Sequence, residues 1–193
     1  MAEPQPYAQL QMIWPERLLD SPPTPGVPQG YELRCFTEAD EPGFLDVMAK
    51  AGFKSWDHEQ LVKALPSILP GGHLVIVHRA TGRLVATAMA RHRPTEQHPG
   101  GGELAWVAGD PDHRGRGLGM AACAAVTARF IQAGYRRIYL MTDDWRLPAL
   151  KTYLKLGYEP FLFQDDMVER WRRVYEQLGW LPGALPHAQG PAM

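Results

Sequence analysis

Three glycines that alternate with other residues, Gly115, Gly117 and Gly119, are the part of this sequence best suited to bind a ligand. They follow a strand-like run at 103–107 and precede an alanine-rich run of helical character. Glycine adopts backbone angles that are closed to other residues, and the first amides of a helix have no partners within the helix. These amides and the helix dipole attract an anion, so the turn is predicted to bind a pyrophosphate.

Two common nucleotide-binding motifs do not fit this turn. The phosphate loop of nucleoside triphosphatases requires Lys-Ser or Lys-Thr after its last glycine, and neither pair follows here. The dinucleotide-binding fingerprint is Gly-x-Gly-x-x-Gly, whereas these glycines run in steps of two and follow Arg114. The pattern that remains is Arg-x-x-Gly-x-Gly.

That pattern, here Arg114, Gly117 and Gly119, resembles the diphosphate-binding signature of the GNAT superfamily of acyl-CoA dependent N-acyltransferases, Gln/Arg-x-x-Gly-x-Gly/Ala. The Val-x-x-x-Pro segment that leads into it, 107–111, is also similar to that family. The resemblance covers roughly residues 32 to 165.

A second region, 146–158, resembles the family's Asn-x-x-Ala-x-x-x-Tyr-x-x-x-Gly-Phe helix and exit. Two positions differ from that pattern: Arg146 replaces the asparagine, and Tyr158 replaces the phenylalanine. The cofactor contact of the asparagine is therefore not transferred to Arg146.

The resemblance implies an α/β fold, the GNAT-like acyl-CoA N-acyltransferase fold, in which helices flank a mixed central sheet. Local patterns predict strands at 32–36, 73–78, 84–92, 103–109, 137–142 and 161–163. They predict helices from Thr37 to about Lys50, from Ser55 or Asp57 to about Leu65, at 118–132, from Pro148 to Gly157, and at 166–178. The pair Gly71-Gly72 is predicted to end the second helical region.

Length and composition predict one soluble domain. The 193 residues are 45% hydrophobic, enough for a single core. Residues 1–31 are expected to be a Pro-rich arm, with a short stretch at 10–14 packing on the domain, residues 32–180 to be the acetyltransferase domain, and residues 181–193 to be a tail. Cys35 and Cys123 are predicted to be buried free thiols.

The charge is almost balanced, with 20 basic and 21 acidic residues, so no nucleic-acid partner is expected. No apolar run approaches the roughly 20 residues that span a bilayer, and no leader pattern begins the chain. No membrane partner and a cytoplasmic location are therefore expected. His73, His78 and His92 lack metal-ligand spacing, so no metal is expected.

The resemblance implies which residues would contact CoA. The pantetheine arm would lie along the fourth strand, against the backbone of Val107, Ala108 and Gly109. The pyrophosphate would lie on the turn formed by Arg114, Gly115, Arg116, Gly117, Leu118, Gly119 and Met120. Two alternatives remain: 107–109 is an ordinary strand end, and the side chains of the two arginines are merely exposed.

Two residues are candidates for acid–base chemistry, again through the resemblance. Glu103 lies eleven residues before Arg114, where histone-acetylating members carry their general base. Tyr153 matches the family's proton donor to the CoA thiolate, and a phenol, whose ordinary pKa is about 10, is protonated at neutral pH. The alternatives are a solvated strand-end glutamate and a tyrosine that packs on the sheet.

The resemblance thus implies transfer of an acetyl group directly from acetyl-CoA to a primary amine of a small molecule. Acceptor contacts are expected from 53–58, 93–102 and 161–167. The side chains that would line the pocket are Trp56, Trp106, Trp145, Asp143, Asp144, Asp165 and Asp166. Acetylation of a protein lysine or N-terminus, a non-catalytic acyl-CoA sensor, and a homodimer all remain open.

Overall fold

The structure is a computed structural model and describes residues 8–180. The predicted tail at 181–193 lies outside the described residues. The strands are β1 (Leu10–Ile13), β2 (Tyr31–Cys35), β3 (Ile68–His78), β4 (Arg83–His92), β5 (Gly102–Gly109), β6 (Ile138–Thr142) and β7 (Glu159–Phe161). The α-helices are α1 (Glu41–Lys50), α2 (His58–Ala64), α3 (Leu118–Gln132), α4 (Leu147–Leu156) and α5 (Met167–Gln177).

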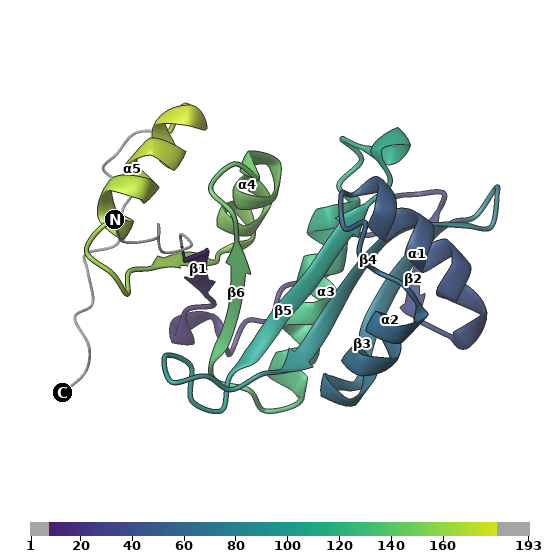
Figure 1. The fold of residues 1–193 in the computed structure, drawn as a ribbon, viewed down its shortest axis with the longest axis horizontal. Helices are drawn as coiled ribbons and strands as arrows, with labels where there is room; N and C mark the ends of the chain where they lie inside the picture. The colour runs from purple at the N-terminus through teal and green to yellow at the C-terminus, as the bar shows by residue number, and fades with distance from the viewer. Residues whose placement is uncertain (1–7, 181–193) are drawn as a thin grey trace, which may run out of the picture.

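The strands form one seven-stranded sheet in the order β2-β3-β4-β5-β6-β1-β7. Strands β5 and β6 are parallel, and the other neighbouring pairs are antiparallel. Helices α1 and α2 lie in front of the sheet and α3 lies behind it (Figure 1). This mixed sheet flanked by helices confirms the predicted fold class.

Each face of the sheet has its own apolar core. Small side chains of α3, among them Ala122 and Cys123, pack tightly behind the sheet together with residues of α4 and α5. In front, Phe44 and Met48 of α1 and Leu61 of α2 pack on β3, β4 and β5. Both cores form around the same sheet, so they hold it rigidly from either side.

Strands β5 and β6 separate soon after they begin. Their paired residues are Gly102 with Ile138 and Glu103 with Tyr139, and the two ribbons diverge beyond this point (Figure 1). Trp106 in β5 has a φ of 53°, in the left-handed region, beside a shift of register with β4. This bulge bends β5 away from β6 and widens the opening.

The N-terminal stretch around residues 10–14 is a strand of the sheet. Strand β1 pairs on one side with β6 and on the other with β7, and Leu10 and Met12 are fully buried. The segment therefore holds β7 to the rest of the sheet. Its alternation of apolar and polar residues is typical of a strand, but short length and neighbouring prolines concealed it.

Three expectations were wrong in detail. Gly71 and Gly72 lie inside β3, where the pairing with β4 shifts in register. Close packing requires glycine at 72, because a Cβ there would come within 2.8 Å of the Leu69 carbonyl oxygen. Cys35 is exposed, since β2 is an edge strand and Cys35 is its last residue. The last strand is Glu159–Phe161, two residues earlier than predicted, and it pairs with β1 over these residues.

No helix within residues 8–180 is long and apolar enough to cross a membrane.

We expect His73 to make the protein sensitive to acid. It is buried in β3, stacks on Phe36 with 4.1 Å between ring centroids, and burial lowers its pKa from 6.5 to about 4. Between these two pH values the unfolded chain binds more protons, so stability falls as the pH falls through this window. A pKa difference of one unit corresponds to about 1.4 kcal/mol.

Urea unfolding at several pH values would check this expectation. The free energy of unfolding of His73→Gln should fall less steeply between about pH 6.5 and about pH 4 than that of the unaltered protein. Parallel profiles for the two proteins would contradict it.

Candidate active site

The glycine turn before α3 is open to a ligand. Gly115 and Gly117 have φ values of 75° and 79°, which other residues rarely adopt, and Gly117 is the N-cap of α3. A Cβ on Gly115, Gly117 or Gly119 would meet nothing within 4 Å, so no protein atom in the described part requires a glycine at 119. The turn therefore exposes backbone amides at the positive end of a helix dipole, which fits a pyrophosphate.

The two arginines of the turn differ in their contacts. The Arg116 Nη1 donates a hydrogen bond of 3.0 Å to the Tyr31 hydroxyl, which lies 2.8 Å from Nδ1 of His113. Arg114 is exposed and has no side-chain partner within residues 8–180. Arg114 is thus the arginine whose guanidinium is free for a phosphate.

The predicted pantetheine strand has one open edge. Ala108 and Gly109 pair with Thr87 and Ala86 of β4. On the other side, β5 has no paired residue in β6 after Glu103 within the described part of the chain. The backbone groups of 104–109 that do not point toward β4 therefore face the opening between the two strands, where an extended amide chain can add like a strand.

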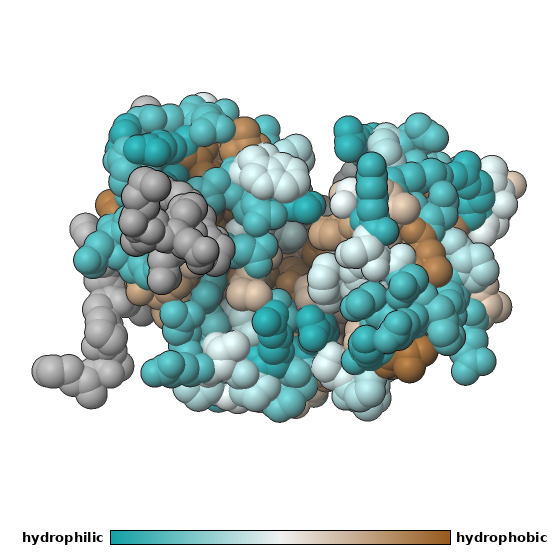
Figure 2. Space-filling view, in the orientation of Figure 1, coloured by the Kyte–Doolittle hydropathy of each residue, from teal (hydrophilic) through white to brown (hydrophobic). Residues whose placement is uncertain are grey.

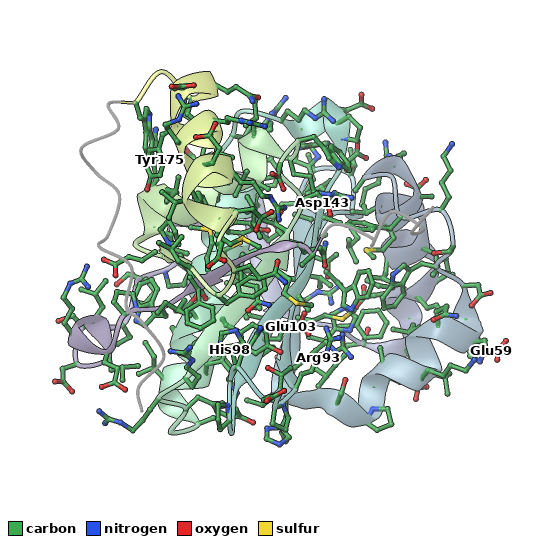
Figure 3. All side chains as sticks on the ribbon, turned by 60° about the vertical axis from the view of Figure 1, so that its left-hand side comes forward. Glu59, Arg93, His98, Glu103, Asp143 and Tyr175 are labelled. Carbon is green, nitrogen blue, oxygen red and sulfur yellow. The ribbon has the colours of Figure 1, made fainter. Side chains whose placement is uncertain are left out.

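Glu103 lies where β5 and β6 part. It is 5% exposed, and its carboxylate accepts from Arg93 Nη1 at 3.0 Å and from Arg91 Nη1 at 3.5 Å. Its paired neighbours place it on the same face of the sheet as Arg91, Met89 and helix α1. Figure 3 shows Glu103 beside Arg93 and His98, with Asp143 further along the sheet.

The loop between β4 and β5 is fastened to this face by His98. Its Nε2 donates to the Gln11 side chain at 2.6 Å, and its Nδ1 accepts from Arg137 Nε at 2.9 Å. Burial, aided by the charge of Arg137, lowers the pKa of His98 to about 4, so the ring is neutral at pH 7. The ring also stacks on Tyr139 at 4.0 Å, and the Tyr139 hydroxyl donates to the Arg93 carbonyl at 2.8 Å.

Tyr153 lies on the opposite face of the sheet from Glu103. It is 6% exposed, and it belongs to the core that α3 and α4 form. Burial raises its pKa well above 10, and the neighbouring thiol of Cys123 adds to this effect. The phenol is therefore protonated at neutral pH, and within residues 8–180 its hydroxyl has no hydrogen-bond partner.

Residues expected to line an acceptor pocket fall into two groups. Trp56 and Trp106 lie together with 4.8 Å between ring centroids, and both pack against the core in front of the sheet. The acidic residues lie elsewhere: Asp143, Asp144 and Asp166 line a cavity of about 510 Å³ beside α5, and Arg170 contacts Asp144 and Asp166. Figure 2 shows a hollow with apolar residues on its floor between the α1–α2 side and the α4–α5 side.

Comparison with known proteins shows the family of this chain. The sequence matches the acetyltransferase (GNAT) family over residues 32–158. The chain belongs to the GNAT family.

This GNAT chain has relatives among bacterial acetyltransferases. It is 32% identical over 150 residues to mycothiol acetyltransferase of Saccharomonospora viridis, covering 71% of this chain and 48% of that protein. For the Thermobispora bispora enzyme of the same name the identity is 33% over 146 residues, covering 70% and 49%. The chain spans about half the length of these relatives.

A solved structure shares the fold of this GNAT chain. It is a GCN5-related N-acetyltransferase from Sphaerobacter thermophilus, with a TM-score of 0.64 and 24% identity, and the match covers 80% of this chain and 49% of that one. The likeness supports the GNAT fold.

Sequence reasoning missed several residues of the candidate site of this GNAT chain. Arg91, one of the two arginines that contact Glu103, was not predicted, and Arg93 was predicted only as part of the acceptor segment 93–102. Gln11 comes from β1, which no local pattern places beside this site. The left-handed Trp106 has no sequence signal, because bulky residues rarely adopt that conformation.

Proposed function

We propose that this chain is an N-acetyltransferase that moves an acetyl group directly from acetyl-CoA to a primary amine of a small molecule. The opening between β5 and β6 carries the proposal, because it lies between Glu103 on one face and Tyr153 on the other. The name of the mycothiol acetyltransferases supports a small acceptor.

The residues that would hold acetyl-CoA lie along the open edge of β5 and in the turn before α3. Amides from 115–119 would bind the pyrophosphate, with Arg114 beside them, and the open edge of Val107, Ala108 and Gly109 would bind the pantetheine arm. Acetyl-CoA supplies an acyl group that is activated as a thioester. An amide at the β5 bulge would polarise the acyl carbonyl.

Glu103 would accept the proton that the amine loses, directly or through a water molecule. Hydrogen bonds from Arg91 and Arg93 hold its carboxylate in place, at the point where β5 and β6 separate. Tyr153 would give its proton to sulfur from the rear face as the carbon–sulfur bond breaks. The electron pair of that bond stays on sulfur, and Tyr153 regains a proton from solvent.

Calorimetric titration with acetyl-CoA, followed by thiol release with amines, amino acids, aminoglycosides and peptides, would test the proposal. We expect binding, and thiol release with one class of small amine. Absence of binding would overturn the cofactor assignment, and binding without release would favour a sensor. Release with peptides alone would replace the small acceptor by a protein amine.

A further inference from the structure

Strand β5 has one extra residue beside the opening. From Met89 to Thr87 there are two steps along β4, but the paired stretch of β5, 105–108, has three. Trp106 lies within this stretch, and its φ of 53° is in the left-handed region. A bulge of this kind can turn a side chain to the other face of a sheet, and bulges are frequent beside active sites.

The bulge turns Trp106 to the front of the sheet. In a regular strand it would face the rear together with Leu104, since every second residue shares a face. Its side chain instead packs against the front core. Glu103 lies on this front face, three residues earlier in the same strand. Trp106 is therefore on the side from which an amine would reach Glu103.

The indole N–H of Trp106 has no hydrogen bond. Within residues 8–180, its Nε1 is buried and has no hydrogen-bond partner, whereas a buried tryptophan N–H usually finds one. Trp14 and Trp171 also have unpaired N–H groups, but both lie deep in the rear core, and Trp106 is only partly buried. An unpaired donor and a left-handed backbone are both unfavourable, and such features gather at sites that bind ligands.

Two rings from the loop between α1 and α2 cover the indole of Trp106. The distances between ring centroids are 4.8 Å for Trp56 and 5.6 Å for Phe53, and both contacts are edge to face. The guanidinium of Arg146 lies 4.7 Å from the centroid of the Phe53 ring. These contacts give the indole N–H no oxygen or nitrogen as a partner. A ligand that displaced the two rings would meet a hydrogen-bond donor on the same face as Glu103.

We propose that Trp106 determines the specificity for the acceptor, and that its indole N–H donates a hydrogen bond to an oxygen a few bonds from the amine nitrogen. The proposal rests on the proposed function. The indole nitrogen only donates, so its partner has to be a hydroxyl or carbonyl oxygen. The acceptor is then a small amine that carries such an oxygen, as amino alcohols and amino acid amides do, and not a plain alkylamine.

Pairs of amines of similar shape, with and without the oxygen, test this inference. Ethanolamine is compared with propylamine, and glycinamide with isobutylamine, by thiol release from acetyl-CoA. Trp106→Phe keeps an aromatic ring at the same backbone angle but removes the N–H. For at least one pair, the ratio of the two kcat/KM values should fall about tenfold in this variant. The amines differ in basicity, and comparison of the same ratio in the two proteins cancels that difference.

Trp56→Phe is the matched control. It alters a neighbouring ring of the same aromatic group and leaves the N–H of Trp106 in place. It can lower kcat/KM for both members of a pair, but it should keep their ratio. Thermal unfolding shows whether each variant is folded.

The NMR resonance of the Trp106 indole N–H provides a test without turnover. Its loss in Trp106→Phe assigns it. In the protein bound to CoA, ethanolamine or glycinamide should shift this resonance, because the N–H moves from aromatic rings to an oxygen. Propylamine and isobutylamine should leave it nearly unchanged.

The outcomes separate this inference from the proposed function. Unchanged ratios for both pairs in Trp106→Phe would overturn the role of Trp106. An equal fall of the ratio in Trp56→Phe would also overturn it, since ring packing and not the N–H would then set the preference. Absence of thiol release with every amine would count against the proposed function. In that case the resonance decides about Trp106, and no shift with ethanolamine or glycinamide would overturn its role.

Discussion

Gly117→Glu should abolish binding of CoA. The substitution places a carboxylate at the N-cap of α3, where the exposed amides and the dipole would hold a pyrophosphate, so it replaces attraction by repulsion. A side chain here points into open space, because a Cβ would meet nothing within 4 Å. We expect the affinity for CoA, measured by calorimetry, to fall at least a thousandfold, about 4 kcal/mol.

Gly117→Ala is the control for backbone strain. It keeps φ at 79° without adding charge, which costs about 1–2 kcal/mol in the left-handed region. The alanine variant should have a lower melting temperature and should still bind CoA. If the glutamate variant binds CoA as well as the alanine variant does, the turn is not the pyrophosphate site.

Glu103→Gln should lower kcat about a hundredfold or more and leave CoA affinity unchanged. The substitution keeps the shape of the side chain but removes the group that would accept the proton of the amine. The contacts with Arg91 and Arg93 lose their charge, so thermal unfolding must show that the variant is folded. Steady-state kinetics with a saturating amine, and calorimetry with CoA, would then check the loss of kcat and the unchanged affinity.

Glu32→Gln offers a matched control for this experiment. Glu32 lies on the edge strand β2, away from the opening between β5 and β6, and forms an ion pair of 3.1 Å with Arg79 that is more exposed than the contacts of Glu103. It should leave kcat unchanged. If Glu103→Gln is destabilised but keeps its kcat, Glu103 is only a cross-link that holds the loop of Arg93.

The elements around the glycine turn were predictable because their signals are local. Helix α3 begins at Leu118 and ends at Gln132 as predicted, since Gly117 and Gly134 adopt left-handed angles just outside it. Gly157 ends α4 in the same way. Asp57 is the N-cap of α2, and its side chain accepts from the Gln60 amide at 2.9 Å.

The partners of the candidate site were not predictable, because they depend on which strands become neighbours. A period of two indicates a strand but not the strand beside it, so neither the place of β1 nor the contact of Gln11 with His98 could be inferred. The contacts of Arg146 could not be predicted from the sequence either. Its departure from the family pattern was visible, whereas its contact with Phe53 needs the packing of two distant loops.

Strand β1 is synthesised long before either of its neighbours in the sheet. Gln9 and Asp143, which share a hydrogen bond of 3.0 Å, are 134 residues apart in the chain. Closing so long a segment is slow, and it has to wait until β6 has left the ribosome. A growing chain therefore completes the turn before α3 first, and the side of the opening that carries Tyr139 and Asp143 is ordered last.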